Sequence, residues 1–224
     1  MLVRAEPELL QPPHPFAGLR RHGYAAIVAD PALAFTSYTS IQSSNPQSTR
    51  DLRRHYQCMS FEEICALSVA DLATKSGCHL FLWTSPPNVE RSLTILRSWG
   101  FKFSSKAFTW VKLRRGFDPQ QLRFTPLIEG DLHYSLGLTT RKSTEDVLLG
   151  RRGNCRRIAR DVREVILSPV REHSRKPDEV YARIERYCAG PYLELFARTR
   201  RVNWDAWGDE LEKFPANSRR TDPC

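Results

Sequence analysis

The sequence predicts one α/β domain with a mostly parallel sheet and helices on both faces of that sheet. Three observations lead to this fold class. Apolar and β-branched runs alternate with amphipathic patterns along the chain, which favours parallel strands joined by crossover helices. No internal repeat and no break in composition divides the chain. With 224 residues, 41% of them hydrophobic, the chain is long enough to build one large core.

Six segments have the pattern of strands, which are short apolar, aromatic or β-branched runs bounded by turn residues. They cover residues 24–30, 78–85, 101–112, 144–153, 162–169 and 190–198. The run "CHLFLWTS" at 78–85 is almost continuously apolar, which is typical of a strand covered on both faces.

Three segments have the pattern of helices, at residues 60–73, 87–100 and 176–188. The first opens with a serine cap and two glutamates. The second stops at Gly100, and the third has Pro177 near its first position and acids in its first turn. The stretch "NWDAWGDE" at 203–210 is interpreted as a final turn or short helix.

The remaining segments are polar or irregular. Residues 36–54 are rich in Ser, Thr, Asn and Gln, and a loop of this length in a compact domain is often a lid or a binding segment. Residues 114–143 are irregular and basic. Residues 1–23 are interpreted as an N-terminal arm and residues 211–224 as a polar tail, which leaves residues 24–210 as the domain.

The chain is basic, with 34 Lys and Arg against 25 Asp and Glu, a net charge of +9. Such an excess attracts polyanions, of which nucleic acid is the commonest, although a solubility feature explains the charge equally well. The six cysteines show no C-x-x-C pair and no zinc-type spacing, so we expect free thiols and no metal. Without a signal-peptide pattern or an apolar run of membrane length, we expect a cytoplasmic protein with no membrane contact.

The stretch "AAIVADPALAF" at 25–35 carries the most informative acid. It predicts a buried strand that ends on Asp30 and is followed at once by Pro31. Open α/β sheets bind ligands at the carboxyl ends of their strands, where Asp30 is expected. An Asp-Pro after a strand is on its own most often only a turn, so the chemistry depends on further segments.

Eight segments in order make the chain resemble a known family. They begin "VADP" (28–31), "HYQCMSFEEI" (55–64), "HLFLWTSPPNVERSLTILRSWGF" (79–101) and "FTWVK" (108–112). They continue "STEDVLLGRRG" (143–153), "REHSRKPDEVYARIER" (171–186), "YLELFAR" (192–198) and "NWDAWGDE" (203–210). The chain resembles, over residues 24–210, the methyltransferases typified by the catalytic subunit of the messenger-RNA adenine methyltransferase, which have bacterial and phage DNA-modifying relatives.

The resemblance implies a Rossmann-like methyltransferase with circularly permuted motifs, in which the catalytic motif comes first and the cofactor-binding strand late. It implies S-adenosylmethionine as cofactor and N6-methyladenine as product. DNA is favoured over RNA because the compact basic chain is more similar to the bacterial and phage members. Too few residues remain for a separate recognition domain, so we expect low sequence specificity.

The family's catalytic motif corresponds to Asp30, Pro31, Ala32 and Leu33. The Asp30 carboxylate and the Pro31 carbonyl would accept the two amine hydrogens of adenine and aim its lone pair at the methyl group. Ala32 replaces a proline and loosens the turn. Leu33 replaces an aromatic residue that stacks on the base, a contact worth roughly 1–3 kcal/mol. Phe35, Tyr38 or Tyr56 are candidates to supply the missing ring.

The resemblance also implies residues for the two ligands. For the cofactor they are Lys176 on the methionine carboxylate, Arg198 near the ribose, Asp209 and Glu210 on the ribose hydroxyls, and Asp30. For the target they are Tyr56, His173, Ser174 and Phe35. Glu145 matches a family glutamate, and structural pairing with a Lys or Arg is its simpler role.

Three alternatives remain open at this point. A catalytically silent methyltransferase fold could bind nucleic acid or a partner subunit, and Leu33 favours this. The substrate could instead be RNA, or another exocyclic amine such as that of cytosine. Because family relatives pair with similar subunits, the resemblance also allows a homodimer.

Overall fold

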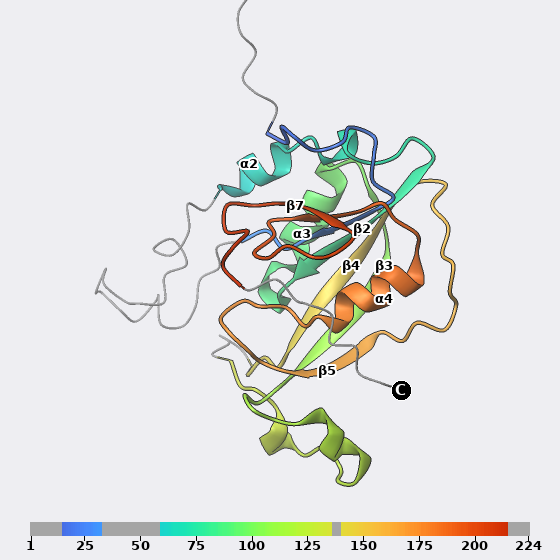
Figure 1. Ribbon diagram of the computed structural model, residues 1–224. Coiled ribbons are helices and arrows are strands. Elements are labelled where there is room, and N and C mark those ends of the chain that lie inside the picture. Colours follow the sequence, from blue (N-terminus) through green and yellow to red (C-terminus); the bar gives the residue numbers. More distant parts are fainter. Residues whose placement is uncertain (1–14, 33–58, 136–139, 215–224) are drawn as a thin grey trace, which may run out of the picture.

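The structure, a computed structural model, describes residues 15–32, 59–135 and 140–214. In these residues the strands form one sheet in the order β5-β3-β4-β2-β1-β6-β7 (Figure 1). They are β1 (Ala26–Ala29), β2 (Gly77–Thr84), β3 (Lys102–Leu113), β4 (Thr144–Gly153), β5 (Val165–Pro169), β6 (Tyr192–Leu195) and β7 (Trp204–Trp207). Only β4 runs antiparallel to its neighbours, which are β2 and β3. The predicted mostly parallel sheet is confirmed.

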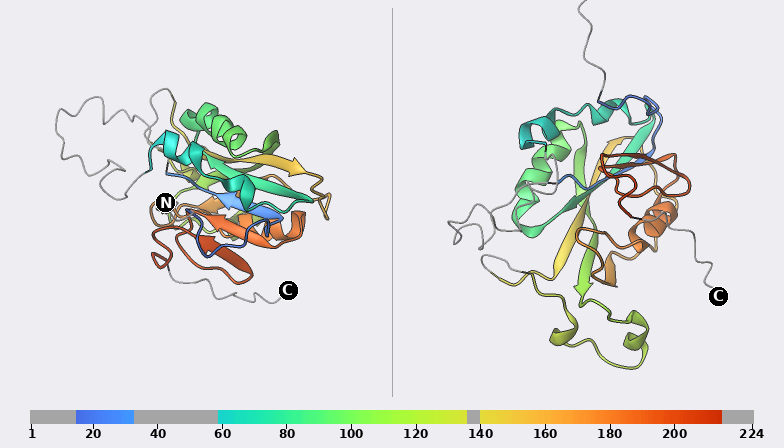
Figure 2. Two further views of the ribbon diagram at one scale, coloured as in Figure 1. Left: turned by 90° about the horizontal axis from the view of Figure 1, so that it is seen from above. Right: turned by 60° about the vertical axis from the view of Figure 1, so that its left-hand side comes forward.

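Helices cover both faces of this sheet, as predicted. α2 (Phe61–Ala66) and α3 (Val89–Ser98) lie on one face, and α4 (Glu179–Tyr187) lies on the other (Figure 2). The Ser60 hydroxyl and the Glu63 carboxylate each accept a hydrogen bond from the other's backbone N–H, which caps α2. The helix predicted over 60–73 ends early, because the backbone is extended at Leu67 and a 3₁₀ turn follows.

Two apolar cores follow from the alternation of side chains along the strands. Ile27 and Leu80 belong to the core beneath α2 and α3, whereas Val28 and Phe81 belong to the core beneath α4. All eight residues of β2 are buried, so the strand predicted at 78–85 is covered on both faces. The central strands are therefore rigid supports for the loops that follow them.

The interpretation of residues 203–210 as a turn or short helix is wrong. Trp204–Trp207 forms β7, the edge strand parallel to β6. The ring of Trp204 stacks on Tyr192 with centroids 4.8 Å apart, and the ladder continues where the Ala197 N–H donates to the Trp207 carbonyl. A strand of four residues is too short to show a period in the sequence, so cross-strand contacts decide its conformation.

Residues 15–23 lie against the same edge of the sheet. Phe16 is buried and its ring packs edge-on against Trp207, with centroids 5.0 Å apart. The Trp207 indole N–H donates to the Pro15 carbonyl, and Arg20 forms an ion pair with Asp205. This segment of the predicted N-terminal arm therefore covers β7.

The carboxyl ends of all the parallel strands meet at one edge of the sheet, which we call the carboxyl edge. Asp30 directly follows β1 there, between the early strand β2 and the late strand β6. The connection from β3 to β4 also leaves at this edge and extends beyond the sheet (Figure 1). Open α/β sheets bind their ligands beside the carboxyl ends of the strands, at the point where the strand order reverses. In this sheet that point is β1, and Asp30 lies at its carboxyl end.

Candidate active site

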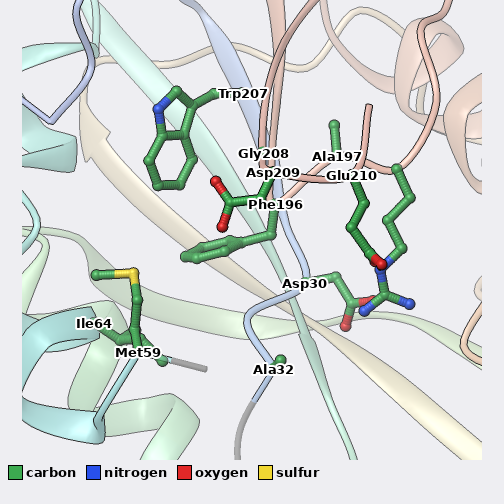
Figure 3. Close-up of a pocket in the computed structure, with 11 residues that line it drawn as sticks. Asp30, Ala32, Met59, Ile64, Phe196, Ala197, Trp207, Gly208, Asp209 and Glu210 are labelled. Atoms are coloured by element: carbon green, nitrogen blue, oxygen red, sulfur yellow. The ribbon is translucent and has the colours of Figure 1, made fainter. Parts of the chain in front are cut away.

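A pocket opens at the carboxyl edge, beside the ends of β1, β6 and β7. Its empty space is about 570 Å³ when the solvent at its open mouth is included. The residues that line it are Asp30, Ala32, Met59, Ile64, Phe196, Ala197, Arg198, Trp207, Gly208, Asp209 and Glu210. Figure 3 shows the Phe196 ring between Met59 on one side and Asp30 on the other. The pocket therefore combines an apolar wall with a charged rim.

Gly208 lets the two chain segments after β6 and β7 come together. A Cβ at this position would lie 2.5 Å from the Ala197 carbonyl oxygen and 2.7 Å from the Ala197 nitrogen, which no side chain tolerates. Phe196 adopts a left-handed conformation with φ of 60° on the facing segment. This close approach brings Glu210 to Arg198, whose Nε lies 3.6 Å from the Glu210 carboxylate.

Asp30 belongs to a buried cluster of charges. The Lys176 Nζ lies 3.0 Å from a carboxylate oxygen of Asp30 and 3.0 Å from one of Glu145. The other Glu145 oxygen accepts a hydrogen bond from Lys112 Nζ. The Lys176 side chain is only 11% exposed, and its ammonium also lies 5.1 Å from the centre of the Trp83 ring. Two cations and two carboxylates thus neutralise one another under the carboxyl edge.

The pKa values of this cluster follow from burial and from the opposite charges. Burial would lower the pKa of Lys176, but the carboxylates of Asp30 and Glu145 outweigh it and raise that pKa to about 12. Burial would raise the pKa of Glu145, but Lys176 and Lys112 lower it to about 2. Lys176 and Glu145 therefore stay charged across the physiological pH range.

A second network, on the α4 face and partly buried, holds the backbone that carries Lys176. One guanidinium nitrogen of Arg171 donates to the Lys176 carbonyl at 2.6 Å, and the other binds Asp178 at 2.7 Å. The second Asp178 oxygen lies 2.9 Å from Arg201, whose Nε lies 3.5 Å from the Glu194 carboxylate. Arg201 therefore links the Lys176 segment to β6.

Tyr181 completes this network on α4. Its ring centre lies 3.6 Å from the Arg201 guanidinium carbon, and its hydroxyl donates to Glu194 at 2.6 Å. Burial raises the pKa of Glu194, although the Tyr181 hydrogen bond and the Arg201 charge oppose this. The charged side chains of this network therefore stabilise one another by pairing with opposite charges.

The structure brings together most of the predicted site residues that it describes. The pocket is lined by five of them, Asp30, Ala32, Arg198, Asp209 and Glu210. Lys176 contacts Asp30 directly, and Pro31, the residue after Asp30, is buried. The Ser174 carbonyl accepts a hydrogen bond from Arg198 at 3.5 Å, and His173 lies exposed in the same loop.

Three predicted residues, Leu33, Phe35 and Tyr56, lie outside the described residues, as does Tyr38. Sequence reasoning missed Lys112, Arg171, Asp178 and Arg201. Lys112 closes the segment "FTWVK", whose Trp110 pairs with Glu145 of "STEDVLLG", so its side chain reaches Glu145 from two residues further along β3. Nothing in the sequence marked the other three as members of one network.

None of the helices in the described residues is long and apolar enough to cross a membrane. No group of three or more His, Cys, Asp and Glu side chains in the same residues is arranged to hold a metal ion.

The chain is similar in sequence to known methyltransferases. The chain is 30% identical over 209 residues to the Type II methyltransferase M.MunI of Mycoplasma sp., covering 88% of this chain and 81% of the relative. It is 32% identical over 160 residues to an N(6)-adenosine-methyltransferase MT-A70-like protein of Arabidopsis thaliana. It is 31% identical over 137 residues to the human N(6)-adenosine-methyltransferase catalytic subunit METTL3.

The two eukaryotic relatives are much longer than this chain. The matches cover 70% and 59% of this chain but only 21% and 22% of the relatives' own lengths. The family model MT-A70 matches residues 24–210, a range that includes Asp30, Lys176 and every described residue of the pocket. This chain belongs to the MT-A70 family of methyltransferases.

Proposed function

We propose that this protein uses S-adenosylmethionine to methylate the exocyclic N6 amine of adenine in DNA. The observation that carries the proposal is the position of Asp30. Its carboxylate lies at the carboxyl end of β1, beside the buried Lys176 and on the rim of the pocket. A hydrogen-bond acceptor there lies between a site for a small cofactor and open solvent, from which a base can enter.

The residues of the pocket fit the chemical groups of S-adenosylmethionine. The apolar wall of Met59, Phe196 and Trp207 suits a purine ring. The Asp209 and Glu210 carboxylates are acceptors for ribose hydroxyls. When bound, the cofactor supplies an electrophilic methyl group on a sulfonium.

Lys176 would bind the carboxylate of the cofactor's methionine part. Its two ion pairs, with Asp30 and Glu145, account for two of its three N–H donors. An ammonium on which these two carboxylates converge is held in a fixed position. Its third N–H donor would be the one that binds the cofactor's carboxylate.

The chain's contribution to the reaction is positioning. The adenine amine is a poor nucleophile because its lone pair is delocalised into the ring. The Asp30 carboxylate accepts one of its N–H hydrogens and the Pro31 carbonyl accepts the other, which favours the pyramidal amine and fixes the direction of its lone pair. The ion pair with Lys176 holds Asp30 in this orientation.

The choice of DNA rests on charge and on one relative. The net charge of +9 suits a polyanion, and the Type II methyltransferase M.MunI is a relative that this chain matches over most of both lengths. RNA is the second candidate, favoured by the names of the adenosine methyltransferases among the relatives. Ala32 and Leu33 favour the remaining alternative, a silent fold, because they depart from the family motif.

A direct experiment separates these possibilities. The purified protein is incubated with methyl-labelled S-adenosylmethionine and unmethylated DNA or RNA, and the nucleosides are identified by mass spectrometry. We expect N6-methyldeoxyadenosine from DNA. Methylcytosine or N6-methyladenosine would redirect the proposal to the other base or polymer. No methylated base on either polymer, with cofactor binding retained in calorimetry, would leave the silent fold.

A further inference from the structure

The connection between β4 and β5 carries an unusual density of exposed cations. We call residues 154–164 the arginine strap. Its four arginines, Arg156, Arg157, Arg160 and Arg163, are all exposed. None of the four forms an ion pair with a carboxylate in the part of the chain that the structure describes. The strap has two acids, and one of them, Asp161, is paired with Arg186 of α4.

The backbone of the strap is nevertheless held firmly. The Asn154 N–H donates to the Ser76 carbonyl at 2.8 Å, and the Ile158 N–H donates to the Tyr187 carbonyl at 2.8 Å. Arg183 of α4 donates to the carbonyls of Arg163 and Val165. Contacts from neighbouring elements thus fix the course of the strap, while its own arginine side chains point to solvent.

The strap starts far from the candidate active site. It leaves β4 at Gly153, which pairs with Gly77 at the first residue of β2, whereas the pocket lies at the carboxyl edge. It then runs along the outside of α4 to the start of β5 (Figures 1 and 2). The strap and Asp30 are therefore separate surfaces of one domain.

We propose that the arginine strap binds the phosphodiester backbone of the nucleic acid at a distance from the target base. This proposal rests on the proposed function, because it concerns the same polymer. Guanidinium groups bind phosphate oxygens through paired N–H donors, and these four have no competing carboxylate. The strap contains no Phe, Tyr or Trp on which a base could stack, which favours the backbone over the bases. Such contacts add affinity without sequence information.

The test compares two double variants with equal loss of charge. R157Q/R160Q removes two strap arginines, and the control R21Q/R97Q removes two exposed arginines outside the strap, Arg21 beside Asp71 and Arg97 on α3. Affinity for a labelled duplex of about 30 base pairs is measured over a range of salt concentrations. We expect the slope of log K against log salt to fall by about 1–2 for the strap variant. We expect no such fall for the control.

Two further measurements keep the test decisive. R157K/R160K, which keeps the charges, should retain most of the slope. A duplex of about 8 base pairs carries far fewer phosphates beyond the target base, so R157Q/R160Q should lose less methylation on it than on the duplex of about 30 base pairs.

The proposal would be overturned if the salt slope of R157Q/R160Q were unchanged, or if the slope of the control fell equally. An equal loss of methylation by R157Q/R160Q on the short and the long duplex would also overturn it. A fall in slope confined to R157Q/R160Q, on a protein that methylates nothing, would retain the strap and reject the proposed activity.

Discussion

Two regions of this molecule use cations in opposite ways. At the carboxyl edge and behind it, Lys176, Lys112 and Arg201 are buried and each contacts at least one carboxylate. On the arginine strap, Arg157 and Arg160 are exposed and face solvent. Buried ion pairs fix geometry, because breaking one leaves an uncompensated charge in the interior. Exposed cations cost little to keep and act on partners through their field. Substitutions in the first region should therefore change stability and turnover, whereas substitutions in the strap should change binding to a charged partner.

The largest effect is expected on turnover from Asp30→Ala. This change removes the acceptor for the adenine amine, and the loss of such a preorganised group typically lowers kcat by about 10²–10³ or more. Lys176 keeps Glu145 as a partner, so cofactor affinity in calorimetry should change little. Glu62→Ala, at an exposed position of α2, is the matched control and should keep full activity. A variant at Asp30 that retains turnover would remove Asp30 from the mechanism.

The next largest effect is expected on stability from Arg201→Met. Its side chain is 12% exposed, and its loss leaves Glu194 and Asp178 without one of their cations. Breaking a buried pair in this way costs about 3–5 kcal/mol of unfolding free energy, measured by urea denaturation. Because Arg171 and Asp178 also hold the Lys176 backbone, KM for the cofactor should rise more than kcat falls. Arg201→Lys should restore part of both losses, which a role in packing alone would not predict.

Glu145 predicts a dependence of stability on acid. Its pKa is lowered from an ordinary value of 4.5 to about 2, so its pairing stabilises the fold above pH 4.5. This stabilisation is lost as the pH falls through about 2, and it amounts to about 3 kcal/mol. Unfolding free energies measured between pH 6 and pH 2 should show this loss. Glu145→Gln should be less stable at pH 6 and should lose less on acidification.

These contrasts also show how far the sequence could predict the molecule. The strand before Asp30 was predictable because an apolar run that ends on an acid needs only local information, and the capped start of α2 was predictable for the same reason. The contact of Lys176 with Glu145 was not, because it depends on how the segment between β5 and α4 packs against β4, about thirty residues earlier in the sequence.

Arg201 could not be identified because nearly all arginines are exposed, and burial is decided by partners distant in the sequence. In the sequence, Arg156 and Arg157 of the strap form only one of several short basic runs, like Arg53-Arg54 and Arg151-Arg152. Which of these runs share a surface depends on how α4 packs against the connection from β4 to β5. In both cases the missing information is which residues distant in the sequence come into contact in the fold.

The smallest effect on stability is expected from the strap itself. R157Q/R160Q removes two exposed side chains that make no ion pair within the described residues, so the unfolding free energy should stay within about 0.5 kcal/mol of the unmodified protein. Relief of repulsion between neighbouring cations could even raise it slightly. Urea denaturation of R157Q/R160Q and of Arg201→Met under the same conditions measures both unfolding free energies. A loss above about 2 kcal/mol in the strap variant would mean that its arginines hold the fold together, and the contrast between the two regions would fail.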